Sequence, residues 1–295
     1  MSVAIVTDST AYLPQSVVDA HGIQVVPLHV VIAGTEFSEG VDVSTEEVAA
    51  ALRAFKPVST SRPSPQAFLD VYEKAAADGA GAIVSVHISA DMSSTVESAH
   101  LAAGHAPVPV HVVDSRSLGM AMGYAVVSAA ELAASGASAQ DVAAQASSRA
   151  QAATVVFYVD TLEHLRRGGR IGAASALLGS ALAIKPILGL SDGSIEPLEK
   201  VRTSSRALAR LEELAAEACE AAPDGVDVAV HHLDSASRAD ALADRLADRL
   251  GQRLGQSAAV TVVELGAVVG AHVGPGTLAV AVSPRPPARP AEGGS

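Results

Sequence analysis

Strand-like and helix-like segments alternate along almost the whole of this 295-residue chain. Apolar runs rich in Val and Ile predict strands, and Ala-rich stretches predict the helices between them. Such alternation is typical of α/β proteins, in which helices pack against a sheet. The strands are expected at 3–6, 24–31, 82–88, 110–113, 154–159, 227–231, 260–263 and 278–282. The helices are expected at 17–20, 45–55, 65–77, 93–103, 119–135, 139–152, 207–221 and 238–250.

The character of the sequence changes near residue 155, and we expect a domain boundary there. Short βα units precede this point, whereas a Gly-rich basic stretch, a hairpin-like segment at 187–201 and further βα pairs follow it. The prediction is an α/β domain over 1–155 with a mainly parallel sheet, and another over 156–283 with a mixed sheet. Residues 284–295 are rich in Pro, Gly and Ala, so we expect them to form a disordered tail.

Composition restricts the partners that the chain can have. The net charge is −12, whereas nucleic-acid binding requires concentrated Lys and Arg. Four Phe, four Tyr and no Trp leave few surfaces for base stacking, so a pocket is expected to have an aliphatic lining. The sequence has no apolar stretch long enough to span a bilayer and no leader pattern at its start. We therefore expect a cytoplasmic protein without stable membrane insertion.

Two runs of hydroxyl side chains lie where a strand or coil gives way to a helix. The first, 59–64, directly precedes Pro65, a residue that suits the first turn of a helix. The second, 89–95, follows the apolar run 82–88. Ser and Thr often serve only as helix caps. Two such runs favour an anion-binding site, because helix N-termini carry unpaired N–H groups and positive dipole character.

Three predicted strands end in the dipeptide Asp-Ser, which begins at Asp8, Asp114 and Asp234. Ligands of open α/β sheets bind beyond the carboxyl ends of the strands, where these residues collect. Asp and Ser also end strands and cap helices for purely structural reasons. Two interpretations therefore stay open at this point: structural caps, or a metal-dependent phosphotransferase or hydrolase that acts on small molecules at these strand ends.

Four cations fall within residues 166–185 of a chain that is otherwise acidic. The glycine pair 168–169 ends the preceding helix, so the two Arg residues before it suit the role of helix-dipole partners. Arg170 lies beyond the glycines and can reach inward to a ligand or partner. His272, in a Gly- and Pro-rich turn between two strands, can hydrogen-bond a carboxylate or phosphate.

A further alternative function is a regulatory sensor, which would bind lipid and report to another protein through the basic stretch at 166–170.

Motifs for catalysis are absent from the sequence. It contains no phosphate-binding Gly-x-x-x-x-Gly-Lys loop, no Gly-x-Ser-x-Gly elbow and no zinc-binding pair of Cys or His residues. No residue pair stands out as a nucleophile with its base. We therefore expect no catalytic residues, no metal and no cofactor.

Seven segments, taken in order, resemble the DegV family of bacterial fatty-acid-binding proteins. They are 7–11, 60–64, 89–99, 113–115, 162–171, 184–188 and 272–276. The resemblance implies two α/β domains with a ligand tunnel between them that holds a long-chain fatty acid. It also implies a carrier that is not itself an enzyme. Similar proteins are the acyl-carrying subunit of fatty acid kinase: a separate kinase phosphorylates the bound carboxylate, and the acyl phosphate feeds phospholipid synthesis.

The resemblance also implies a ligand site. Its expected members are Thr60, Ser61, Ser93, Ser94, Thr95, Arg170 and His272. The first three would hydrogen-bond the carboxylate, and the last two would line the entrance or meet the kinase. Two positions depart from the family pattern. Gly is usual where Ser94 stands, so its side chain is expected to crowd the carboxylate or to add a hydroxyl. Gln is usual where Arg62 stands, so a positive charge is added near the head group.

Overall fold

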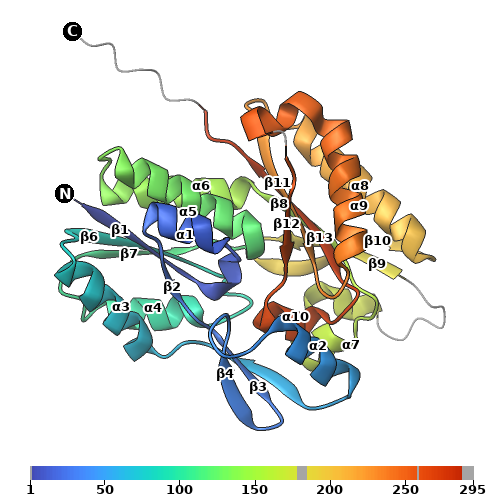
Figure 1. Ribbon diagram of the computed structural model, residues 1–295, viewed down its shortest axis with the longest axis horizontal. Coiled ribbons are helices and arrows are strands. Elements are labelled where there is room, and N and C mark those ends of the chain that lie inside the picture. The colour runs from blue at the N-terminus through green and yellow to red at the C-terminus, as the bar shows by residue number, and fades with distance from the viewer. Residues whose placement is uncertain (1, 178–184, 258, 288–295) are drawn as a thin grey trace.

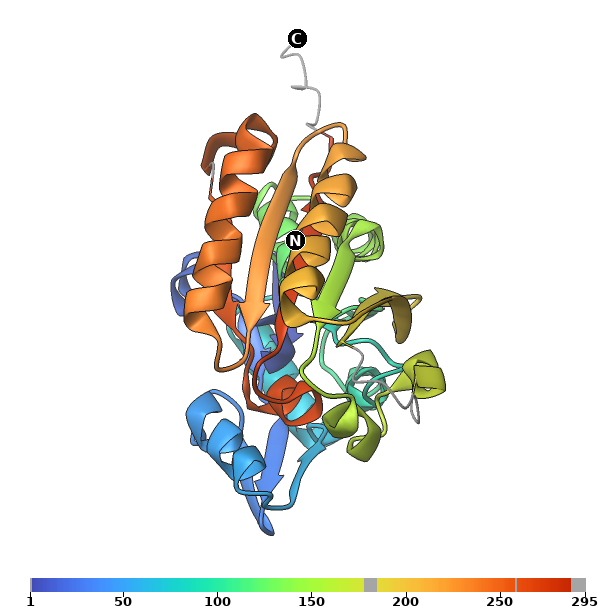
Figure 2. The same ribbon diagram turned by 90° about the vertical axis from the view of Figure 1, so that its right-hand side faces the viewer.

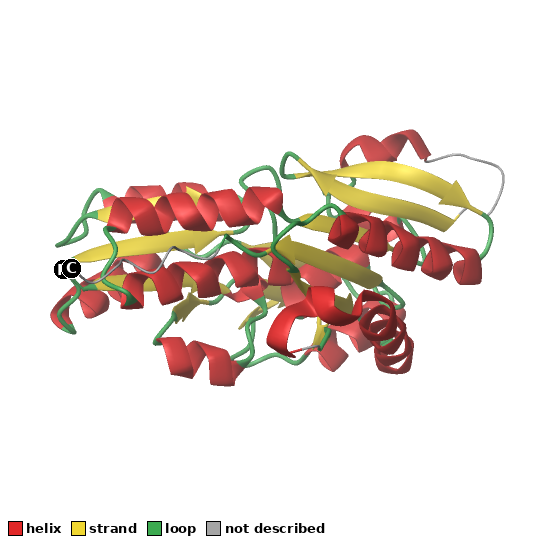
Figure 3. Ribbon diagram, turned by 90° about the horizontal axis from the view of Figure 1, so that it is seen from above, coloured by secondary structure: helices red, strands yellow, loops and turns green. Residues whose placement is uncertain are grey.

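The computed structural model of the chain describes residues 2–177, 185–257 and 259–287. Two large sheets and one small sheet organise these residues (Figure 1). The predicted fold class is confirmed, because one large sheet is parallel, the other is mixed, and helices flank the strands (Figure 3). The first of the large sheets ends with a strand at 110–114 and the second begins with a strand at 154–158.

The parallel sheet has the strand order β2-β1-β6-β7. Its strands are Val3–Asp8 (β1), Gln24–Val26 (β2), Ala82–His87 (β6) and Val110–Asp114 (β7). Helices α3 (Pro65–Ala77) and α4 (Thr95–Ala103) bury their apolar residues against one face. Helices α1 (Gln15–His21), α5 (Gly119–Ala134) and α6 (Ala139–Ala152) do so against the other.

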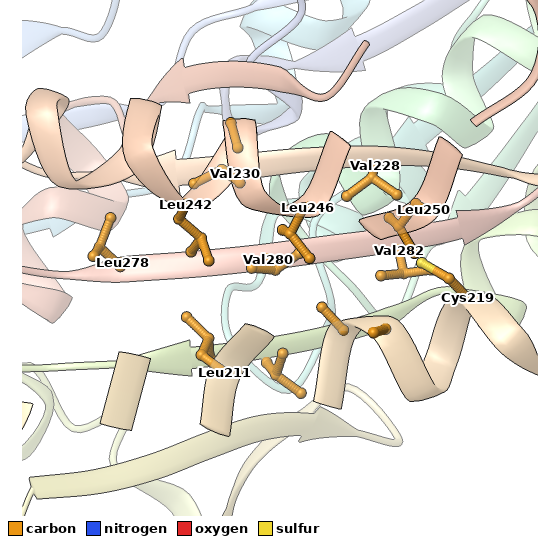
Figure 4. Packing of buried hydrophobic residues seen from close by; sticks show 14 of the residues in the cluster. Leu211, Cys219, Val228, Val230, Leu242, Leu246, Leu250, Leu278, Val280 and Val282 are labelled. Atoms are coloured by element: carbon orange, nitrogen blue, oxygen red, sulfur yellow. The ribbon is translucent and has the colours of Figure 1, made fainter. Parts of the chain in front are cut away.

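The mixed sheet has the order β10-β9-β8-β13-β11-β12, in which β11 and β12 pair in parallel and the other neighbours are antiparallel. Its strands are Thr154–Tyr158 (β8), Lys185–Ser191 (β9), Ser194–Val201 (β10), Val226–His232 (β11), Thr261–Glu264 (β12) and Leu278–Pro284 (β13). Helices α8 (Ser204–Glu220) and α9 (Ala236–Leu250) lie side by side on it (Figure 2). Their apolar faces, including Leu211, Cys219 and Leu246, form the core with β11 and β13 (Figure 4).

The small sheet is antiparallel, with the order β4-β3-β5, and the sequence did not predict it. It consists of His29–Ile32 (β3), Thr35–Ser38 (β4) and Val58–Ser61 (β5). The single strand expected at 24–31 is therefore wrong: it is two strands in different sheets, separated at Pro27, which lacks the N–H that a ladder needs. The hydroxyl run 59–64 also lies partly in a strand, and only Ser64 caps α3.

Helix α2 (Thr45–Arg53) packs with this sheet against α10 (Ala267–Val273), and α7 (Glu163–Arg167) contacts α10 as well (Figure 1). The turn expected around His272 is wrong, because this residue lies in the last turn of α10. The run Ala-Val-Val at 267–269 is buried and supplies the apolar side that holds the helix in place. Short 3₁₀ helices occupy Ser9–Ala11, Gly172–Leu177 and Gly251–Ser257.

The predicted hairpin is confirmed: β9 and β10 pair antiparallel and turn at Asp192 and Gly193. The domain boundary at 155 stays a prediction, although the chain passes from one large sheet to the other between β7 and β8. Pro284 and Arg285, which we expected in the tail, belong to the folded part, because β13 includes Pro284 and Arg285 forms an ion pair with Asp227. Residues 288–295 of the predicted tail lie outside the described residues. No helix among those described is long and apolar enough to cross a membrane.

Candidate ligand-binding site

A cavity lies where the small sheet, the start of α4, α7, α10 and β10 meet. We call it the head cavity. Its polar lining residues are Thr60, Ser61, Arg62, Ser93, Arg170 and His272. Its apolar lining residues are Leu28, Ile88, Met92, Leu118, Leu165, Ile195, Val268, Val269 and Val273. Cationic and hydroxyl groups therefore share this cavity with a larger number of apolar side chains.

A second cavity adjoins the first, and we call it the tail cavity. Four lining residues, Leu118, Ile195, Val269 and Val273, belong to both cavities. The remaining lining residues of the tail cavity are Val155, Phe157, Leu190, His231, Leu265, Thr277, Ala279 and Ala281. The head cavity thus has a partly polar lining, and the tail cavity beside it has a mainly apolar lining. Such a pair of neighbouring cavities suits an amphipathic ligand.

Thr60 and His272 meet at the polar end. Thr60 lies on β5, His272 lies in the last turn of α10, and the Thr60 hydroxyl is 2.8 Å from Nε2 of the imidazole. Burial, and secondly the charge of Arg170, lower the pKa of His272 to about 4. The ring is therefore neutral at neutral pH. Its Nδ1 is buried and has no hydrogen-bond partner among the described residues.

Ser93 lies just before α4, and its hydroxyl is 2.8 Å from that of Thr95. Thr95 is fully buried and does not line the head cavity, so it can act on a ligand only through Ser93. Ser94 is exposed, makes no capping hydrogen bond and does not line the cavity. Ser94 thus neither crowds the head cavity nor adds a hydroxyl to it in this structure, and its role toward a bound head group stays a prediction.

Thr60 and Ser61 are consecutive residues of a strand, so their side chains point to opposite faces of the small sheet. The Ser61 hydroxyl donates to Glu36 on β4 at 3.2 Å. Although Ser61 lines the head cavity, its hydroxyl is thus directed to a carboxylate on the other face. Arg62 also lines the cavity, and its guanidinium forms an ion pair with Glu97 at 3.2 Å. Glu97 therefore offsets the charge that Arg62 was expected to add.

Arg170 lies at the border of the cavity, where two backbone carbonyls hold it. Its Nε donates to the carbonyl of Met92 at 3.0 Å, and its Nη1 donates to that of Gly168 at 2.7 Å. Both partners are carbonyl oxygens, and among the described residues no Asp or Glu forms an ion pair with this guanidinium. The charge is available to an anion in the head cavity.

The Asp-Ser strand ends serve as structural caps and do not converge. Asp8 is fully buried: one oxygen accepts from Thr10 and the other accepts from the backbone N–H of Ile88 at 2.9 Å. Asp114 accepts from two backbone N–H groups. Asp234, which follows β11 of the other large sheet, pairs with Arg53. The described residues contain no group of three His, Cys, Asp or Glu that could hold a metal. This arrangement favours the structural interpretation of the dipeptides.

Sequence reasoning missed the apolar wall of the site. Val269 and Val273, one helical turn apart on α10, and Leu118 and Ile195 from other elements line both cavities. In the sequence such residues look like ordinary core residues, because a cavity wall and a packed core both require apolar side chains. The glycines and valines at 266–274 could have indicated a closely packed helix, but not the space beside it.

Comparison with known proteins gives a consistent result. The family model described as "Uncharacterised protein, DegV family" matches residues 2–285. A DegV domain-containing protein of Streptomyces coelicolor is 53% identical over 283 residues, which cover 96% of this chain and 99% of the relative. The crystal structure of DegV, a fatty acid binding protein from Bacillus subtilis, superimposes with a TM-score of 0.86 at 30% identity, covering 97% of this chain and 100% of that chain. A fatty-acid-binding DegV family protein from Thermus thermophilus gives 0.85 at 33% identity, with the same coverage.

Proposed function

The chain belongs to the DegV family, and on that premise we propose that it binds a long-chain fatty acid and presents it to a separate kinase. The carboxylate lies in the head cavity and the acyl chain extends into the tail cavity. The observation that carries this proposal is that a cavity with cationic and hydroxyl groups and an apolar cavity share four lining residues. An amphipathic ligand with one anionic end matches both parts.

The apolar end supplies most of the binding free energy. Removing an acyl chain from water is worth about 0.8 kcal/mol per methylene, so a sixteen-carbon chain gives on the order of 10 kcal/mol before association costs. Phe157 and Leu265 line the tail cavity beside residues shared with the head cavity. Their aliphatic and aromatic surfaces offer no hydrogen bond to a polar ligand, which selects for hydrocarbon.

The polar end fixes the orientation of the ligand through a relay from His272. In the tautomer that carries its proton on Nε2, the neutral imidazole donates to the Thr60 oxygen 2.8 Å away. The Thr60 hydroxyl proton is then free to bind a carboxylate. This tautomer leaves Nδ1 as an unprotonated acceptor, which has no partner among the described residues. His272 is thus a positioning residue, and Thr60 contacts the ligand.

Ser93 and Arg170 complete the polar lining of the site. When Thr95 donates to Ser93, the Ser93 hydroxyl proton can also bind the carboxylate. Arg170 adds a positive charge, and charge-assisted hydrogen bonds are worth roughly 1.5–3 kcal/mol. Hydroxyl donors leave the carboxylate ionised, as it must be to accept a phosphoryl group. Partial enclosure would shield an acyl phosphate from water after transfer.

Two binding measurements test this proposal. Palmitate and its methyl ester are titrated against a fluorescent fatty acid held by the protein. Palmitate should displace the probe far better than the ester, because the ester has no charge for Arg170 and Thr60 to bind. Equal displacement by both would contradict the head-group assignment. The kinase step is tested by adding a bacterial fatty acid kinase with ATP and measuring phosphate transfer to the bound palmitate, with palmitate free of this protein as the control.

A further inference from the structure

A surface cleft adjoins the polar side of the head cavity, and we call it the basic cleft. It lies between the end of α2, strand β5, α7 and α10. Thr60, Arg170 and His272 line both the head cavity and this cleft. Lys56 and Arg167 line only the cleft. A group attached to the polar end of a bound ligand would therefore enter the cleft directly.

The charge of the cleft is unusual for this chain, which has 32 acidic and 20 basic residues. Its lining, as far as the structure describes it, contains no Asp or Glu. A cleft at the opposite ends of α2 and α10 has the reverse character. Its lining includes Asp8, Glu39, Glu46 and Glu264, without a described Lys, Arg or His. The two helices thus run from an acidic cleft to a basic one.

Much of the positive charge in the basic cleft is not neutralised by neighbouring carboxylates. Within the described residues Lys56 makes no ion pair, and Arg170 contacts carbonyl oxygens. Arg167 pairs with Glu163 at 2.6 Å, but Glu163 is shared with Arg166. The histidines contribute no charge at neutral pH, because burial lowers the pKa of both His164 and His272.

We propose that the basic cleft binds the phosphoryl group of a phosphorylated lipid whose acyl chain occupies the head and tail cavities. The inference rests on the proposed function, because it places the lipid chain in the same space. A carboxylate carries one negative charge, and Arg170 with the two hydroxyls is sufficient for it. A phosphate monoester carries about 1.5 to 2 negative charges and three acceptor oxygens, so it needs further cations. Lys56 and Arg167, which line the same cleft as Arg170, supply them.

The test compares two lipids that differ in the head group. Hexadecyl phosphate, which resists hydrolysis, and palmitate are each used to displace a bound fluorescent fatty acid. The variant Lys56→Ala removes an exposed charge that lines only the basic cleft. Lys200→Ala removes an exposed lysine of β10 outside the cleft and is the matched control. Lys56→Ala should weaken hexadecyl phosphate roughly fivefold, as for one exposed charge pair, and leave palmitate within about twofold.

The outcomes separate the two proposals. If palmitate fails to displace the probe, the proposed function is contradicted. If palmitate binds and Lys56→Ala affects both lipids equally, or neither, only the phosphoryl site is overturned. Arg167→Gln should behave like Lys56→Ala, which guards against one misfolded variant. Inorganic phosphate added to the palmitate-bound protein, followed by ³¹P NMR, distinguishes the sources: tight binding of free phosphate that depends on Lys56 would overturn a site for the lipid-borne group.

Discussion

The imidazole of His272 occupies the space that a Cβ on Gly168 would fill. His164, which lies on α7 four residues before Gly168, makes the reverse contact. Its ring occupies the space that a Cβ on Gly274 would fill. Each of the two Gly-rich segments thus receives a histidine from the other. This interlocking fixes α10 against α7, and it places Nε2 of His272 at the Thr60 hydroxyl.

The substitution Gly168→Ala tests whether this packing positions the head-group site. Gly168 has a helical φ of −75°, so Ala brings no backbone strain, but its Cβ would displace His272. We expect at least a tenfold loss of palmitate affinity, corresponding to about 1.4 kcal/mol. Gly104→Ala is the matched control, since Gly104 also ends a helix with φ −66° and its Cβ would meet only an ordinary contact. Equal affinities of the two variants would rule the positioning role out.

The Thr60→Val substitution tests the contribution of a single hydroxyl while keeping the shape of the side chain. Loss of the hydrogen bond to the carboxylate should weaken palmitate binding at least about tenfold, because a hydrogen bond to a charged group is worth roughly 1.5–3 kcal/mol. Ser61→Ala should have a smaller effect, since the Ser61 hydroxyl is directed to Glu36. Isothermal titration calorimetry on both variants measures the difference. A larger loss for Ser61→Ala would show that the ligand turns this hydroxyl inward.

His272 should make the protein less stable as the pH falls. Its pKa is lowered in the folded state to about 4 from 6.5, so the folded protein favours the neutral ring. The stability is complete above pH 6.5 and decreases as the pH falls toward 4, by up to about 3 kcal/mol from this group. Urea unfolding at pH 7.5 and pH 4.5 measures the loss. The variant His272→Gln should lose less stability than the wild type between pH 7.5 and pH 4.5. An equal loss in both proteins would contradict the assignment of this pH dependence to His272.

Glu39 should have the opposite pH dependence. Burial raises its pKa to about 6 from 4.5, although hydrogen bonds from Ser9 and from the backbone N–H of Val268 oppose the shift. The folded protein therefore favours the protonated carboxyl: the contribution is complete below pH 4.5 and is lost as the pH rises through 6, by up to about 2 kcal/mol. The difference in the free energy of unfolding between Glu39→Gln and the wild type should therefore favour the variant more at pH 7.5 than at pH 5. A difference that does not depend on pH would count against the shift.

The alternation of apolar and Ala-rich segments was sufficient to predict the α/β class and the β9–β10 hairpin. It could not predict the small sheet, because the polar sequence Val-Ser-Thr-Ser of β5 becomes a strand only by pairing with β3, whose residues lie about thirty positions earlier. Nor could it separate β2 from β3, since both belong to one apolar run around Pro27.

The site shows the same division between local and long-range information. Thr60, Ser93, Arg170 and His272, which the family resemblance indicated, line one cavity, but their meeting depends on contacts across as many as 212 positions. The exposure of Ser94 depends on where the backbone enters α4, and the direction of Ser61 depends on the register of β5. Neither can be found in the composition of the hydroxyl runs.

Mass spectrometry of an organic extract is the most direct test of the central claim. The protein is purified without added lipid, denatured, extracted and compared with an equal amount of the Gly168→Ala variant. The account predicts about one C14–C18 fatty acid per chain in the native protein and substantially less in the variant. An extract without fatty acid, together with no uptake of added palmitate or oleate, would contradict the assignment of the two joined cavities to a lipid.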